Sequence, residues 1–247
     1  MIISPENWQQ VGQRPSLERI ENKITAILED MDCRYLSFSG GLDSSLMLYF
    51  MIQVYGKVEL FTIGKSEKHP DVVHSKDVAA YFGKSVKHHV YIPTEVEIVK
   101  VWQFDILKQI DNSSNSNHDG DDAVRLFYQF VAEHTDRIIA CDGIDEYACG
   151  YYAHQDNPTE ETYYNQLWQL CDRHLLPLDV NSGMIDVYLP YLDSGLLVLL
   201  NQIPIADKVD SNTRKKILVE IAKGKLPDSV INRRKYGLCQ ALVDLRV

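Results

Sequence analysis

The sequence of 247 residues lacks any uninterrupted apolar run of the roughly 18 residues that a transmembrane helix requires. Its first residues, Met-Ile-Ile-Ser-Pro-Glu-Asn, also lack the basic start and apolar stretch of a secretory signal. We therefore expect neither membrane insertion nor secretion, and we predict a cytoplasmic protein.

Paired cysteines and an excess of positive charge are absent as well. No two cysteines form a Cys-x-x-Cys pair, so a zinc site is not predicted, and an odd number of cysteines fits a reducing compartment. The 25 basic residues are outnumbered by 35 acidic ones, which gives a net charge of −10. This balance argues against a nucleic-acid partner but leaves room for a small phosphate pocket.

Strand-like and helix-like segments alternate over the first 151 residues. The predicted strands cover residues 34–38, 58–62, 85–91 and 137–141. The predicted helices cover residues 17–28, 46–54, 71–82, 94–110 and 123–134, and a polar tract at 111–122 is predicted to be a surface loop. Beyond residue 152 the pattern is mainly helical, without a clear strand. We therefore predict an α/β fold, with a twisted parallel sheet covered by helices on both faces and a mainly helical C-terminal part.

A glycine- and serine-rich motif follows the first predicted strand: Ser39-Gly40-Gly41-Leu42-Asp43-Ser44-Ser45. Two glycines allow close approach of a ligand to backbone N–H groups, and the next helix directs the positive end of its dipole to the same place. The carboxylate of Asp43 would repel a bare phosphate, so the motif indicates phosphate together with Mg²⁺. The alternative is an ordinary glycine turn before a helix.

Two further motifs come later in the chain. Asp142-Gly143-Ile144-Asp145-Glu146 follows the fourth predicted strand, and Arg233-Arg234-Lys235-Tyr236-Gly237 lies near the C-terminus. Because the carboxyl ends of parallel strands share one edge of a sheet, Asp43 and Asp145 are expected to face each other. Alone, these motifs would also fit a turn at a strand end and a solvated basic surface.

In this order, the three motifs resemble the synthetase domain of asparagine synthetases and their β-lactam synthetase relatives, which are N-type ATP pyrophosphatases. Four shorter segments support the resemblance, which extends over residues 33–240: Phe61-Thr-Ile-Gly64, His88-His89, Leu189-Pro-Tyr-Leu-Asp193 and Lys215-Lys-Ile-Leu218. The resemblance implies a single synthetase domain over residues 1–247. Within it we expect a helical lead-in at 1–32, a nucleotide-binding core at 33–151 and a helical part at 152–247 that completes the active site.

The resemblance also implies the ligands and their residues. ATP and Mg²⁺ are expected, with Asp43 and Asp145 as metal ligands. Lys215 is expected to contact the leaving pyrophosphate, and Lys235 to stabilise the charge that develops during the reaction. Asp142 is either the base that accepts a proton from the amine or a residue that caps its turn. The residues expected to bind ATP are Ser39, Gly40, Gly41, Asp43, Ser44, Ser45, Ile63 and Gly143.

The implied reaction joins a small-molecule carboxylate, activated as its adenylate, to ammonia or an amine. A cyclase that forms an amide within a specialised metabolite or peptide is the first alternative, and a non-catalytic ATP-binding subunit is the second. No glutaminase domain precedes the first motif, so ammonia, a substrate amine or a separate glutaminase partner is expected. Tyr188 and Val219 stand where the family has arginines, which implies a substrate other than aspartate. The resemblance allows a homodimer without requiring one.

Overall fold

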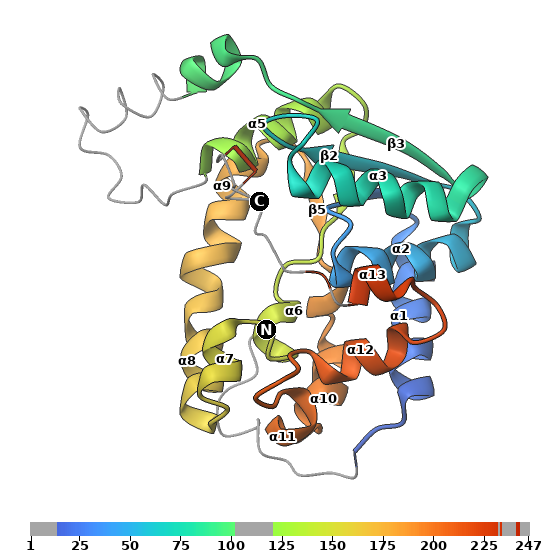
Figure 1. Ribbon diagram of the computed structural model, residues 1–247, viewed down its shortest axis with the longest axis vertical. Coiled ribbons are helices and arrows are strands. Elements are labelled where there is room, and N and C mark those ends of the chain that lie inside the picture. Colours follow the sequence, from blue (N-terminus) through green and yellow to red (C-terminus); the bar gives the residue numbers. More distant parts are fainter. Residues whose placement is uncertain (1–13, 102–120, 232, 234–240, 243–247) are drawn as a thin grey trace.

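Five parallel strands form one sheet, in the order β3-β2-β1-β4-β5 (Figure 1). The computed structural model describes residues 14–101, 121–231, 233 and 241–242. The strands are β1 (Tyr35–Ser37), β2 (Val58–Ile63), β3 (Val86–Tyr91), β4 (Arg137–Ile139) and β5 (Asp186–Tyr188). The predicted α/β fold with a parallel sheet is confirmed.

The prediction that no strand follows residue 152 is wrong. Strand β5 pairs with β4 in parallel, with Ile138 opposite Val187, and extends the sheet on the side away from β3. Its three residues are too few to show a period of two, and only one of them is aliphatic. Pairing with β4 therefore makes this segment a strand, because the local pattern alone does not favour one.

Alternate residues of the central strands pack into two separate hydrophobic clusters. Leu60 belongs to one cluster and Phe61 to the other, and the same alternation separates Ile139 from Ile138. Buried side chains on both faces are typical of a parallel sheet covered by helices on both sides. The fold class thus follows from the strands' own side chains.

Helices from before, between and after the strands in the sequence share the larger cluster. Helix α1 begins after its N-cap Ser16, whose hydroxyl accepts a hydrogen bond from the N–H of Arg19. The helices that contribute buried side chains to this cluster are α1 (Leu17–Met31), α2 (Leu42–Tyr55), α3 (Pro70–Phe82), α6 (Ile144–Tyr147), α8 (Glu160–Leu170), α10 (Ser194–Asn201), α12 (Lys216–Ala222) and α13 (Asp228–Ile231). Helices α5 (Asp121–Ala132) and α9 (Leu176–Ser182) supply the smaller cluster on the other face.

Short helical turns complete the architecture. They are the turn η2 (Gly83–Ser85), α7 (Tyr152–Asp156), the π-helical turn η3 (Cys171–Leu175), the turn η4 (Pro190–Leu192) and α11 (Ile205–Lys208). Residues 95–101 are helical, which agrees with the start of the helix predicted at 94–110, and the rest of that helix lies outside the described residues. Helix α5 begins two residues earlier than predicted, at the end of the polar tract. Among the described residues, no helix combines the length and apolar character that crossing a membrane would need.

Lys208 is fully buried within the helical part. The side chain of Lys208 is 1% exposed, donates a hydrogen bond of 2.9 Å to the hydroxyl of Tyr163 and lies over the ring of the same tyrosine. Burial lowers the pKa of Lys208 to about 8. The folded protein therefore keeps this ammonium at a cost in free energy, because desolvation disfavours the charged form.

We predict that Lys208→Met stabilises the protein at pH 7 by about 1–3 kcal/mol, since methionine fills a similar volume without a charge. The wild type gains stability as the pH rises from about 8 to 10.5, because over that range the unfolded chain binds the proton more tightly than the folded one. The advantage of the methionine variant should therefore shrink over the same range in urea titrations. A constant difference from pH 7 to pH 10 would contradict this account.

Candidate active site

The loops that follow β1 and β4 meet at the carboxyl edge of the sheet. From β1 the chain proceeds outward to β2 and β3, and it then returns to the other side of β1 as β4. The crevice at such a switch in strand order is where open parallel sheets bind their ligands. The topology therefore places the first and second sequence motifs at one site.

The first motif forms a tight loop that only glycine can build. Gly40 has a φ of +69°, and a Cβ added to it would lie 2.7 Å from the backbone of His74 and Ser75 in α3. Gly41 is the N-cap of α2, and its N–H donates to the hydroxyl of Ser39 over 3.3 Å. The loop is thus pressed against α3, and the first N–H groups of α2 have no helix carbonyl to bond to.

The two serines at the start of α2 are both buried. The hydroxyl of Ser44 donates to the carbonyl of Gly41 over 3.4 Å. The hydroxyl of Ser45 has no hydrogen-bond partner among the described residues. A buried hydroxyl without a partner is costly, so Ser45 is a candidate to bond a group that the loop would bind.

Lys215 joins the two motifs. Its ammonium lies 2.5 Å from Oδ2 of Asp43 in α2 and 2.7 Å from Oδ1 of Asp145 in α6. All three side chains are largely buried, and the lysine is 6% exposed. The two carboxylates that the sequence predicts to face each other therefore do so, with one cation between them.

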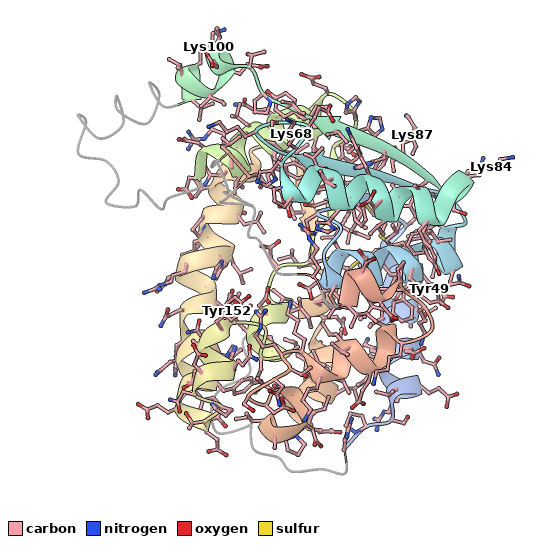
Figure 2. The ribbon with its side chains drawn as sticks, in the orientation of Figure 1. Tyr49, Lys68, Lys84, Lys87, Lys100 and Tyr152 are labelled. Carbon is pink, nitrogen blue, oxygen red and sulfur yellow. The ribbon has the colours of Figure 1, made fainter. Side chains whose placement is uncertain are left out.

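The backbone around Lys215 is shaped for this contact. Lys215 has a φ of +53°, unusual for a residue with a side chain, and is the N-cap of α12. A Cβ at Gly150 would overlap both Oδ1 of Asp145 and Cε of Lys215. The neighbouring Arg214 donates to the carbonyl of Gly150 over 2.6 Å, and its guanidinium stacks on the ring of Tyr152, labelled in Figure 2. Steric fit and this arginine thus hold the lysine against the carboxylates.

Asp43 and Asp145 also fit a magnesium site in the chemistry of their atoms. Within the described part of the chain, no three acidic, histidine or cysteine side chains gather around one point. Mg²⁺ in nucleotide sites is usually held by one or two carboxylates, with waters and phosphate oxygens completing its shell. Two carboxylates close enough to share one ammonium match that requirement.

The segment around η4 supports both halves of the site. Gly143 has a φ of +87°, and a Cβ there would overlap the side chain of Leu192. The hydroxyl of Tyr191, which is fully buried, donates to the backbone carbonyl of Asp43 over 3.1 Å. Asp142 precedes Gly143 and lies close enough to Glu146 for its charge to contribute to raising the pKa of that carboxyl.

Three polar side chains that the sequence analysis does not assign lie beside Asp145. The hydroxyl of Tyr151 donates to Oε1 of Glu146 over 2.7 Å and lies 3.3 Å from Nε2 of His174. Burial raises the pKa of Glu146, and the hydrogen bond from Tyr151 opposes that shift. Glu146 and Tyr151 belong to the second motif and its continuation, but only the tertiary structure brings His174 to them.

The residues expected at the adenine lie at the end of β2. Ile63 is buried opposite Tyr91 of β3, and the N–H of Gly64 donates to the carbonyl of Tyr91. The next N–H, of Lys65, donates to the carbonyl of Ala241 over 2.8 Å. The C-terminal segment therefore returns to this edge of the sheet.

The third motif is described only at its first residue. Arg233 donates to the carbonyl of Ser39 over 2.5 Å and forms an ion pair with Asp71 of α3. Lys235, which is expected to be catalytic, lies outside the described residues, and its role stays a prediction.

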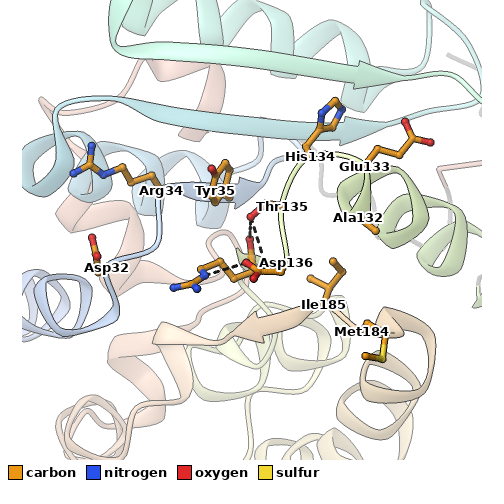
Figure 3. Close-up of a pocket in the computed structure, with 11 residues that line it drawn as sticks. Asp32, Arg34, Tyr35, Ala132, Glu133, His134, Thr135, Asp136, Met184 and Ile185 are labelled. Atoms are coloured by element: carbon orange, nitrogen blue, oxygen red, sulfur yellow. Dashed lines mark hydrogen bonds and ion pairs between the residues drawn. The ribbon is translucent and has the colours of Figure 1, made fainter.

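A pocket of about 870 Å³ lies at the opposite edge of the sheet (Figure 3). Its lining includes Arg34 and Tyr35 at the start of β1 and Asp136 and Arg137 at the start of β4. None of the residues that the sequence analysis assigns to ATP or metal lines it. The candidate site is therefore the carboxyl edge and not this pocket.

We predict that Lys215→Met lowers the free energy of unfolding by about 3–5 kcal/mol, because it leaves two neighbouring buried carboxylates without their cation. Millimolar Mg²⁺ should restore part of the loss by binding those carboxylates. The matched control is Lys216→Met, which breaks an exposed ion pair with Asp210 and should cost less than about 1 kcal/mol. Equal urea midpoints for the two variants would show that the buried pair contributes little.

Comparison with solved structures returns two synthetases among its matches. NMN synthetase from Francisella tularensis is 11% identical, with a TM-score of 0.48, and the match covers 91% of this chain and 77% of that one. The NH3-dependent NAD synthetase from Campylobacter jejuni subsp. jejuni NCTC 11168, in complex with nitrate, is 16% identical, with a TM-score of 0.37 and coverage of 78% and 96%. At these scores the two structures add no detail to the site. No curated protein matches the sequence.

The model of the asparagine synthase family matches two overlapping segments, residues 35–189 and 181–244. Together they cover the sheet, both motifs of the site and α12 with Lys215. The match supports the general activity of an ATP-dependent, amide-forming synthetase. The chain belongs to the asparagine synthase family.

Proposed function

We propose that the protein activates a small-molecule carboxylate with ATP, releases pyrophosphate and joins the acyl group to ammonia or a substrate amine. The observation that carries the proposal is the contact of one ammonium, that of Lys215, with Asp43 after β1 and Asp145 after β4. A cation and two carboxylates beside a glycine-rich helix N-terminus suit a polyphosphate that leaves with high negative charge.

In the first step, an oxygen of the substrate carboxylate attacks the α-phosphorus of ATP. A P–O bond forms to the substrate, the bond between the α- and β-phosphates breaks, and the electron pair leaves with pyrophosphate. The N–H of Gly40 and the hydroxyl of Ser45, which has no partner among the described residues, would donate to phosphate oxygens. Backbone groups at Ile63 would hold the adenine at the end of β2.

Mg²⁺ would be held by Asp43 and Asp145 and would supply charge neutralisation on the phosphates. The contact of the Lys215 ammonium with both carboxylates supports its proposed role as the positive partner of the departing pyrophosphate. Lys235 of the third motif would stabilise the negative charge that develops on the acyl group.

In the second step, the amine nitrogen attacks the acyl carbon. A C–N bond forms, the C–O bond to AMP breaks, and the nitrogen loses a proton to a base. Asp142 is the candidate for that base, because it lies three residues after the end of β4 and near Glu146 beside the site. Tyr188 and Val219, in place of two family arginines, favour a substrate other than aspartate, such as the precursor of a cyclised metabolite.

We predict that ATP labelled at the α-phosphate is converted to AMP, with pyrophosphate, only when a suitable carboxylate and ammonia or an amine are present. Asp43→Asn should slow this conversion at least about 100-fold, the size of effect seen when one charge-stabilising group is removed. Asp30→Asn, which changes an exposed residue of α1, is the control. Formation of ADP and phosphate would contradict the proposal, and ATP binding without turnover across a wide panel would favour a non-catalytic subunit.

For Asp142 we predict a separation of the two steps. Asp142→Asn should slow transfer to the amine by about 10²–10⁴-fold, the usual contribution of a general base. Carboxylate-dependent exchange of labelled pyrophosphate into ATP should continue, because the first step needs no proton acceptor. Asp142→Glu retains a carboxylate and should recover much of the transfer rate. Normal transfer by the asparagine variant would leave Asp142 as a turn residue only.

A further inference from the structure

The guanidinium of Arg233 joins three segments that are distant in the sequence. One nitrogen, Nη1, donates to the backbone carbonyl of Ser39 over 2.5 Å, and the other, Nη2, donates to Oδ1 of Asp71. Ser39 begins the glycine-rich loop, Asp71 lies in the first turn of α3, and Arg233 opens the third motif. The side chains of Arg233 and Asp71 are only 4% and 5% exposed.

The contact with Ser39 fixes the orientation of the next peptide unit. In a trans peptide, the carbonyl of one residue and the N–H of the next point in opposite directions. Holding the carbonyl of Ser39 towards Arg233 therefore directs the N–H of Gly40 to the other side of that plane. Gly40 needs such a hold, because its φ of +69° is one of many conformations that glycine can adopt.

The ion pair with Asp71 determines how Arg233 acts. Because a carboxylate lies against the guanidinium, the pair as a whole carries little net charge towards a phosphate. A Cβ at Gly41 would lie 3.7 Å from Nη1, so the guanidinium is adjacent to the loop. The planar guanidinium of Arg233 can donate to the carboxylate of Asp71 and to the carbonyl of Ser39 at once. The single ammonium of a lysine cannot reproduce that geometry.

The same C-terminal part of the chain contacts the adenine side of the site. Ala241 is fully buried, and its carbonyl accepts a hydrogen bond from the N–H of Lys65, two residues after Ile63. Arg233 and Ala241 are therefore both held at this edge of the sheet. Arg233 bonds to the phosphate loop, and Ala241 bonds to the chain just after β2. Arg233 is the anchor on the phosphate side.

We propose that Arg233 is a positioning residue for the phosphates of ATP. Held by Asp71, it fixes the carbonyl of Ser39 and thereby presents the N–H of Gly40 to the phosphate chain, without touching the nucleotide. The inference rests on the proposed function, since it requires ATP phosphates in this loop. The proposal gives Arg233, the first residue of the third motif, a role separate from that of Lys235.

The test compares the binding of Mg²⁺-ATP and of adenosine to the whole protein by titration calorimetry. Arg233→Gln should weaken ATP binding about 10-fold or more and leave adenosine binding within about twofold, because only the phosphates depend on the loop. Arg233→Lys should weaken ATP binding by less. Lys225→Gln, which removes an ion pair with Glu21 of α1, is the control and should bind both ligands as the wild type does.

The outcomes are distinguishable. ATP and adenosine affinities that fall together, or an unchanged ATP affinity, would overturn the positioning role. A wild type that binds no ATP would overturn the proposed function and this inference together. If Arg233→Gln does not fold because Asp71 is left buried without a partner, the double variant Asp71→Asn, Arg233→Gln removes both charges and is measured in its place.

Discussion

The contact of Lys215 with two carboxylates is the interaction on which the rest of the site depends. Asp43 and Asp145 would repel each other if both were charged and buried with no cation between them. The lysine removes that repulsion and holds the loop after β1 to the loop after β4. The distance between the halves of the site is therefore set by electrostatics, and Mg²⁺ with phosphates would satisfy the same requirement.

Close packing around this contact leaves little freedom to the backbone. Gly150 has no room for a side chain beside Asp145 and Lys215, and Gly143 has none beside Leu192. Gly40 is equally confined, by the backbone of α3. Each of the loops that form the site thus contains a glycine because another segment occupies the space where a Cβ would lie.

The supporting contacts come from regions far from the motifs in the sequence. Tyr191 holds the backbone of Asp43, Arg214 holds that of Gly150, and Arg233 holds that of Ser39. In each case a buried or stacked side chain fixes a backbone carbonyl of the site. Such preorganisation lets a site stabilise charge without rearranging when the charge develops. All three side chains come from the C-terminal third of the chain, although the glycine-rich loop and the second motif precede it.

The sequence by itself determined the fold class, because alternating strands and helices with apolar residues on both strand faces require a covered parallel sheet. It also determined that Asp43 and Asp145 share an edge, since parallel strands carry their following loops to the same side. Only the tertiary structure decided that β5 is a strand, that Lys215 lies between the two carboxylates and that Arg233 pairs with Asp71. These features arise from contacts between residues distant in the chain, for which no local period or spacing exists. The placement of His174 beside Tyr151 has the same origin, because a helix-rich segment with no motif of its own brings it there.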